Sequence, residues 1–179
     1  MRDHRRGYMY DLSIFDNNNV NITWSDIYYG IKNNLLELMC VSEYAIKYIE
    51  KTGDDCQKII DLAWQNDDKS DLLKDMAQII KKENESDDCQ SIIKWQYCIV
   101  KELRDRQMKI EDLSDCLDEA YANFEYPEEM EEFISYMPIK DGYNPSIHTK
   151  EENIERILKK VDEFLTNKAN EIVGFKQSK

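Results

Sequence analysis

Apolar residues recur at intervals of three and four along most of this chain. The series from Trp24 to Leu38 and from Ile154 to Ile172 are the clearest. This spacing places the apolar side chains on one face of an α-helix. Polar stretches such as QNDDKSD, residues 65–71, separate one series from the next. The pattern therefore predicts a succession of amphipathic helices joined by short polar loops.

Eight helices are expected from these series and from residues that favour helix ends. The second ends at Gly53, the fifth runs to about Gln107, and the last stops near Gly174. The fifth is apolar around much of its circumference, which is typical of a central helix. The eight helices are expected to begin near Thr23, Ser42, Asp54, Ser70, Asp87, Ile110, Pro127 and Thr149.

Two of these helix starts fit the capping box, in which a hydroxyl and a carboxylate bind opening N–H groups. The pairs are Thr23 with Asp26 and Thr149 with Glu152. Gly30 lies inside the first helix at a cost of about 1 kcal/mol relative to alanine. We expect a neighbouring helix or a bulky ring to press against it.

Few helix-breaking residues occur, since the 179 residues include 5 glycines and 3 prolines. A β-sandwich or barrel needs more turn residues. The predicted fold is all-α, an irregular bundle or short array of about eight helices. Residues 1–21 lack a clear period and are expected to form a short extended N-terminal arm, partly mobile, with YMYDLSIF (8–15) as a short strand or a packed arm. A single helical domain is expected over 22–175.

Two helix starts share nearly the same sequence, 33 residues apart. DDCQKII begins at Asp54 and DDCQSII begins at Asp87. The period is typical of stacked helix pairs such as tetratricopeptide-like units, although their full signature patterns are absent. True repetition and chance similarity between two amphipathic helix starts both stay open.

In the third helix, Cys56 and Trp64 are both expected to point inward.

The chain carries a formal net charge of −13. Such acidity disfavours binding to nucleic-acid phosphates and to anionic lipids, and it suits a basic protein partner. No apolar run reaches the length of a membrane span, and the basic N-terminus MRDHRRGYMYDL lacks the apolar segment of a secretory signal. The five cysteines form no CxxC pair and are typical of small buried residues in a reducing compartment. A cytoplasmic location is therefore expected.

One segment holds most of the charge surplus. Residues 111–132, the acidic window, contain ten acidic residues and no lysine or arginine, and supply −10 of the net charge. Like charges three or four residues apart destabilise a helix by roughly 0.2–0.5 kcal/mol per pair. This favours a surface kept for a cationic partner, with an ordinary solvated face as the alternative. The ten are Glu111, Asp112, Asp115, Asp118, Glu119, Glu125, Glu128, Glu129, Glu131 and Glu132.

Tyrosines beside the acidic window are expected at helix ends or in the proline-containing loop, where they are partly exposed. Tyrosine next to carboxylates is typical of interface anchors, and tyrosines that cap the edge of a core are the alternative. Helical spacing assigns Tyr121 and Phe124 to the core. The predicted partner-binding residues are Asp115, Asp118, Glu119, Glu125, Tyr126, Glu128, Glu129, Glu132, Tyr136 and Tyr143.

The sequence offers little material for catalysis. His4 and His148 have no cysteine or histidine at metal-ligand spacing, and His148 is expected to be an exposed loop residue. No glycine-rich phosphate loop and no nucleophile elbow occurs. We therefore predict no catalytic residue, no cofactor, no metal site and no enzyme activity.

The stretches ITWSDIYYGI (22–31) and SYMP (135–138), together with the chain length, are similar to a small bacterial family of uncharacterised proteins. The resemblance rests on Trp24, Gly30, the SYMP stretch and the overall length, and covers about residues 20–170. Members of that family have been grouped with immunity proteins of polymorphic toxin systems. The resemblance implies a non-catalytic binder that neutralises a toxin domain, and a basic nuclease toxin would fit the acidic window.

Two other functions are consistent with the residues. A scaffold of stacked helix pairs would hold a peptide in its groove. An all-α, magnesium-dependent nucleotide phosphohydrolase would use paired carboxylates, because Asp115 with Asp118 and Glu128 with Glu131 have the i, i+3 spacing that puts both on one helix face.

Overall fold

The computed structural model describes residues 9–54, 56–64, 68–83, 88–106 and 108–177, and in these the fold is all-α, as predicted. By compactness the chain divides into an N-terminal unit, Met1–Trp95, and a C-terminal unit, Gln96–Lys179. The boundary falls inside one continuous helix, α6 (Asp88–Asp105). The sequence analysis expects a single domain over 22–175, whereas each of these units has buried residues of its own.

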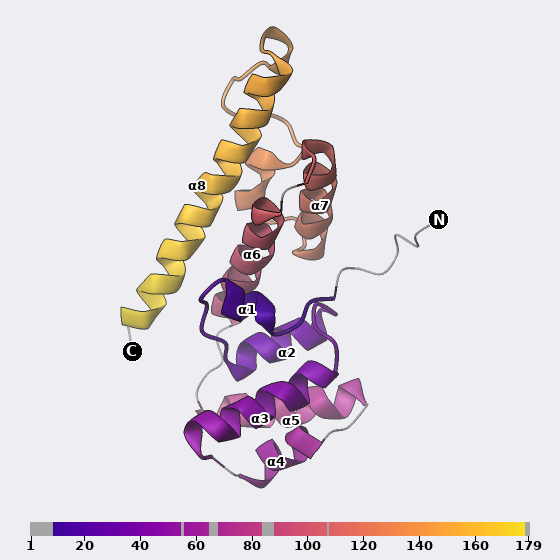
Figure 1. Cartoon of the computed structure of the whole chain (residues 1–179), viewed down its shortest axis with the longest axis vertical. Helices are drawn as coiled ribbons and strands as arrows, with labels where there is room; N and C mark the ends of the chain where they lie inside the picture. The colour runs from indigo at the N-terminus through magenta and orange to yellow at the C-terminus, as the bar shows by residue number, and fades with distance from the viewer. Residues whose placement is uncertain (1–8, 55, 65–67, 84–87, 107, 178–179) are drawn as a thin grey trace. The chain divides into compact units, whose positions relative to one another are not determined.

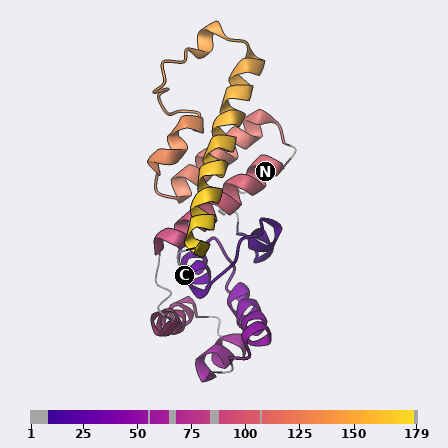
Figure 2. The same ribbon diagram turned by 90° about the vertical axis from the view of Figure 1, so that its left-hand side faces the viewer.

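The N-terminal unit consists of short helices and the first two turns of α6 (Figures 1 and 2). Helix α2 packs on α5, and α4 packs on both α3 and α5. The largest fully buried side chains of this unit come from α1, α2, α4, α5 and α6, and from Leu36 in the loop between α2 and α3. The helices are α1 (Ser13–Asn17), α2 (Trp24–Lys32), α3 (Met39–Thr52), α4 (Gln57–Trp64) and α5 (Lys69–Glu83).

Residues 9–21 are part of this folded unit, although the sequence analysis places them in an arm. Ile14 and Phe15 of α1 are 2% and 0% exposed. Tyr10 forms an isolated parallel bridge with Leu36, and its N–H donates to the Leu35 carbonyl at 2.7 Å. Four apolar residues of this segment are buried, as an arm packed on the domain requires. The helix α1 was not predicted, because the segment has no helical period. Residues 1–8, the first part of the arm predicted to be partly mobile, lie outside the described residues.

Gly30 has the bulky neighbour that the sequence predicts. A Cβ atom built on it would lie 2.6 Å from Cζ2 of Trp95 and 2.7 Å from Cδ1 of Leu36. Trp95 is itself fully buried, with Phe15 edge-on to it at 4.7 Å between ring centroids. Because Gly30 has no side chain, the indole of Trp95 on α6 can pack directly against α2 at this position.

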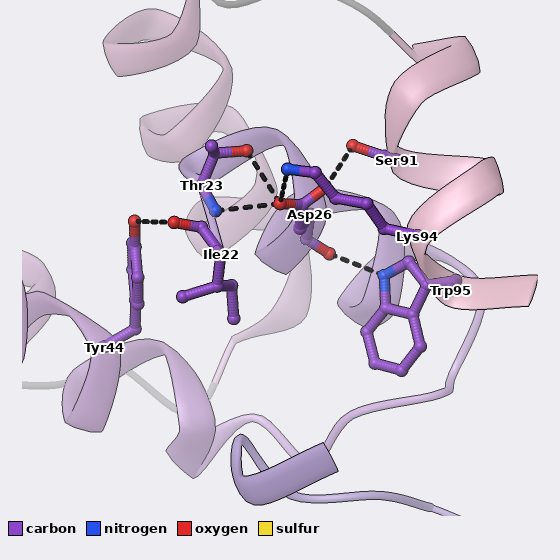
Figure 3. Close-up of polar contacts among 7 residues, drawn as sticks. All are labelled: Ile22, Thr23, Asp26, Tyr44, Ser91, Lys94 and Trp95. Atoms are coloured by element: carbon purple, nitrogen blue, oxygen red, sulfur yellow. Dashed lines mark hydrogen bonds and ion pairs between the residues drawn. The ribbon is translucent and has the colours of Figure 1, made fainter. Parts of the chain in front are cut away.

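Asp26 lies at the centre of a buried polar network that joins α2 to α6 (Figure 3). Its Oδ2 accepts from the N–H of Thr23 at 2.8 Å, as the capping box predicts, and also from Nζ of Lys94 at 2.7 Å. Its Oδ1 accepts from the hydroxyl of Ser91 at 2.7 Å, and its carbonyl accepts from Nε1 of Trp95 at 2.9 Å. The Asp26 side chain is 0% exposed and that of Lys94 is 10% exposed. Since a buried charge needs partners, this network fixes α2 on α6.

The C-terminal unit combines the second half of α6 with two further α-helices and two short 3-10 helices. Helix α8 runs unbroken past Gly174, where the sequence predicts its end, and η1 packs against it. In both views the loop before α8 folds back beside the first turns of that helix (Figures 1 and 2). The elements are α7 (Ile110–Asn123), η1 (Glu128–Phe133), η2 (Pro145–Ile147) and α8 (Lys150–Gln177).

Several local predictions need correction. Helix α3 begins at Met39, so Ser42 lies inside the helix and donates its hydroxyl to the Met39 carbonyl instead of capping the start. Trp64 is 85% exposed at the end of α4, not inward. The element after Pro127 is a 3-10 helix. The αL residue Gly53 does end α3, and the Thr149–Glu152 capping box is present.

The two DDCQ copies occupy unlike environments. The first leads into the eight-residue α4, where Ile59 is buried, and the second leads into the eighteen-residue α6, where Ile92 is half-buried. Cys56 is half-buried, whereas Cys89 is exposed. Equivalent residues of a structural repeat would be buried to a similar extent. The difference in burial between the two DDCQ copies therefore does not support a structural repeat.

Candidate protein-binding surface

Half of the carboxylates in the acidic window are paired with lysines from later in the chain. Helix α8 and the loop before it supply four lysines to α7 and η1. The pairs are Glu111–Lys150 at 2.9 Å, Glu128–Lys140 at 3.6 Å, Glu131–Lys140 at 2.6 Å, Glu129–Lys168 at 2.7 Å and Glu132–Lys160 at 2.9 Å. The local charge surplus is therefore smaller in the folded chain than along the sequence.

The packing of η1 on α8 explains two of these pairs. Lys160 and Lys168 are eight residues apart, close to two helical turns, so they lie on the same side of α8. Lys168 is 5% exposed, and it reaches both Glu129 and Glu171. Because an unpaired buried ammonium is strongly unfavourable, Glu129 has a structural role in holding Lys168.

The other acidic residues of the window divide into two groups. Asp118 accepts from the N–H of Ser135 at 3.1 Å and from its hydroxyl at 2.5 Å, which fixes the segment after η1 on α7. The second group is exposed and forms no ion pair within the described residues. It comprises Asp112, Asp115, Glu119 and Glu125.

Two of the predicted anchor tyrosines meet around a third one. Tyr126 and Tyr136 are 61% and 58% exposed, whereas Tyr121 between them is 2% exposed. The ring centroids of Tyr126 and Tyr136 lie 5.3 Å and 6.3 Å from that of Tyr121. Desolvation raises the pKa of Tyr136, and the nearby Asp118 carboxylate and Tyr126 raise it further. We call Tyr121, Tyr126 and Tyr136 the tyrosine cluster.

The backbone that presents Tyr126 is unusual. Both Glu125 and Tyr126 have left-handed conformations, with φ of 60° and 63°. The Tyr126 N–H donates to the Tyr121 carbonyl at 3.0 Å and the Glu125 N–H donates to the Ala122 carbonyl at 3.1 Å. This is the Schellman ending of a helix, in which Glu125 occupies the position that glycine prefers and Tyr126 packs back on the helix.

Replacing Glu125 by glycine is expected to stabilise the protein by about 0.5–1 kcal/mol. The left-handed conformation costs a residue with a side chain about 1 kcal/mol or more, and the extra freedom of glycine in the unfolded chain offsets part of this gain. Urea denaturation measures the change. The matched control is Glu119→Gly in the interior of α7, where the same substitution is expected to destabilise by about 1 kcal/mol. Equal losses for both variants would contradict the expectation.

Tyr143 does not belong to the tyrosine cluster and lies in the loop before α8. His148 is stacked on its ring at 4.4 Å between centroids and 8° between planes. The guanidinium carbon of Arg156 lies 4.7 Å from the Tyr143 centroid, and Arg156 also binds Asp141 at 2.9 Å. The Tyr143 hydroxyl donates to Asn153 at 2.8 Å. These contacts hold the loop on α8, beside a cavity of about 250 Å³.

The structure thus separates the ten predicted partner-binding residues. It brings Asp118, Tyr126 and Tyr136 together, with Glu125 next to Tyr126 in the chain. Glu128, Glu129 and Glu132 pair with lysines, and Tyr143 holds a loop. Asp115 and Glu119 lie exposed on α7. The four lysines could not be predicted from the acidic window, because they lie outside it in the sequence. Helical spacing assigned Tyr121 to the core but did not indicate that it supports the cluster.

The carboxylates of the phosphohydrolase alternative are largely occupied by protein groups. Asp118 binds Ser135, and Glu128 and Glu131 share Lys140. In the part of the chain that the structure describes, no group of three or more His, Cys, Asp or Glu side chains could hold a metal ion. None of the described helices, the 28-residue α8 included, has the apolar length that a bilayer span needs.

Comparison with known families places the chain in a described family. The model of a family described as "Uncharacterized protein conserved in bacteria (DUF2247)" matches residues 12–169. That range includes α1 to η2 and most of α8, and therefore both compact units. Neither a curated protein nor a solved structure matches the chain.

Proposed function

The chain belongs to this bacterial family, and we propose that it is a non-catalytic protein-binding module whose docking surface is the tyrosine cluster with its neighbouring carboxylates. The surface lies where α7 ends and the segment after η1 begins. The partner is a basic protein. A bacterial immunity protein, which covers the cationic surface of a toxin domain, is the specific form of this proposal.

The observation that carries the proposal is the exposure of Tyr126 and Tyr136 beside carboxylates without ion pairs. The two exposed tyrosines lie side by side around Tyr121, and tyrosine is enriched at interface cores. Glu125 is exposed next to Tyr126 and forms no ion pair within the described residues. The left-handed backbone at both residues is the kind of strain that is retained at functional sites.

The mechanism follows from the chemistry of these groups. Carboxylates attract the lysines and arginines with which a basic toxin domain would grip nucleic acid, and they increase the rate of encounter. The tyrosine rings supply apolar area that is removed from water on contact. A bound module would then block the cationic surface without any chemical step.

The proposal is tested by charge reversal on the surface. The partner is first captured from the native host and identified, and its affinity is then measured by calorimetry. The variant Glu125→Lys is expected to weaken binding by roughly tenfold or more at low salt. The matched control, Glu50→Lys, makes the same charge change on an exposed residue of α3 in the N-terminal unit. Equal losses in the two variants, or no loss in either, would refute this docking surface.

Removing Lys140 is expected to have the opposite effect. Lys140 neutralises Glu128 and Glu131, so Lys140→Gln leaves both carboxylates available to a cationic partner. We expect roughly threefold tighter binding and a steeper salt dependence of the affinity. Lys159→Gln on α8, a 75% exposed lysine with a 3.9 Å contact to Glu163, removes the same charge and serves as the control. Tighter binding by both variants to the same extent would show only an effect of net charge.

A further inference from the structure

We infer that the tyrosine cluster receives an arginine side chain of the partner, in preference to a lysine. The inference rests on the proposed function and specifies which chemical group of a basic partner the surface recognises. It follows from the shape of the cluster, from the carboxylates beside it and from an arginine that the protein already binds in the same way.

The cluster presents flat aromatic surface next to fixed negative charge. Tyr126 and Tyr136 flank the buried Tyr121, so their rings are held by packing while more than half of each side chain stays in solvent. Asp118 is held beside Tyr136 by two hydrogen bonds from Ser135. A planar guanidinium can stack on a ring and hydrogen-bond to a carboxylate at the same time, because its donors lie in its own plane.

The C-terminal unit contains an internal example of this arrangement. Arg156 lies over the ring of Tyr143 at 4.7 Å and binds the Asp141 carboxylate at 2.9 Å. Here one tyrosine and one aspartate share a guanidinium. The tyrosine cluster offers the same pair of groups, Tyr136 with Asp118, and among the described residues neither of the two pairs with an arginine.

Lysine fits this surface less well. Its ammonium is compact and strongly hydrated, and it satisfies a carboxylate without needing an aromatic plane. Lys140 and Lys150 bind carboxylates of the acidic window in this way. Lys168 binds Glu129 and lies 5.7 Å from the Phe164 centroid, at the outer limit of a cation–π contact. A cation that requires both a ring and a carboxylate is therefore better matched by arginine.

The test uses the full-length chain and two ten-residue peptides, one of arginine and one of lysine, which carry equal charge. Calorimetric titration is expected to show roughly tenfold tighter binding of the arginine peptide. In the variant Tyr126→Leu with Tyr136→Leu, this preference is expected to fall below about twofold. The variant Tyr126→Phe with Tyr136→Phe keeps the rings and is expected to retain it, and thermal melting confirms that each variant is folded.

A control and the contrary outcomes complete the experiment. Tyr28→Leu, on α2 in the N-terminal unit, removes a half-buried tyrosine elsewhere and is expected to leave the preference unchanged. Equal affinity for the two peptides would overturn the inference, and so would an arginine preference that persists in the leucine variant. Either result would still be compatible with a basic partner. If neither peptide binds the wild-type chain, the proposed cationic partner is refuted together with the inference.

Discussion

Replacing Asp26 by alanine is expected to lower the free energy of unfolding of the N-terminal unit by about 3–5 kcal/mol. The substitution removes the carboxylate that binds Lys94 at 2.7 Å, and it leaves an ammonium whose residue is 8% exposed without its counter-ion. It also removes the acceptor of the Ser91 hydroxyl and of the Thr23 N–H. Buried polar groups that lose their partners keep the full penalty of their removal from water.

Urea denaturation followed by circular dichroism measures this loss. The control is Asp16→Ala, at a 68% exposed aspartate whose contact with Lys47 is 3.6 Å long, where a change within about 0.5 kcal/mol is expected. The double variant Asp26→Ala with Lys94→Met is expected to be less destabilised than the two single changes together, because it leaves no unpaired charge. Additive losses would show that the two side chains stabilise the protein independently.

Replacing Trp95 by alanine is expected to cost about 3–5 kcal/mol in the same measurement. The indole is 0% exposed, packs on Phe15 and closes over Gly30, and its N–H donates to the Asp26 carbonyl at 2.9 Å. Its removal opens a cavity between α1, α2 and α6 and takes away the indole donor of the Asp26 carbonyl. Trp64→Ala is the matched control, because that indole is 85% exposed and its loss is expected to change stability by less than about 0.5 kcal/mol.

A second change tests the packing on which this prediction depends. Gly30→Ala in the wild-type chain places a Cβ 2.6 Å from the indole and is expected to destabilise by about 1–3 kcal/mol. In the Trp95→Ala background the indole is absent, so the same change is expected to cost less. Some cost persists there, because Leu36 lies 2.7 Å from the added atom. An unchanged cost in both backgrounds would mean that Leu36 alone excludes a side chain at this position.

The acidic window has fewer unpaired carboxylates in the folded chain than its sequence indicates. Along the sequence it contains ten carboxylates without one compensating base, yet α8 and the loop before it bring lysines to five of them. Negative charge alone is therefore no longer sufficient evidence for a binding surface. The proposal now rests on a smaller group of residues, in which exposed tyrosines provide the contact area and the unpaired carboxylates provide the charge complementarity.

The sequence by itself determined the helices and most of their ends. Helical periodicity and the scarcity of glycine and proline are local properties, so they predicted an all-α fold and capping boxes at Thr23 and Thr149. The interior Gly30 likewise predicted a bulky neighbour. The same local rules failed at residues 9–21, because burial there comes from packing with other elements and not from a period in the segment itself.

Only the tertiary structure decided which charges meet. Asp26 looks like a helix cap in the sequence, and its pairing with Lys94, 68 residues later, depends on how α2 packs on α6. The lysines that neutralise the acidic window are 9 to 39 residues away from their partners. Ion pairs form through space, and a pattern confined to neighbouring residues contains no information about them. The tyrosine cluster arose in the same way, since the end of α7 and the segment after η1 became neighbours only on folding.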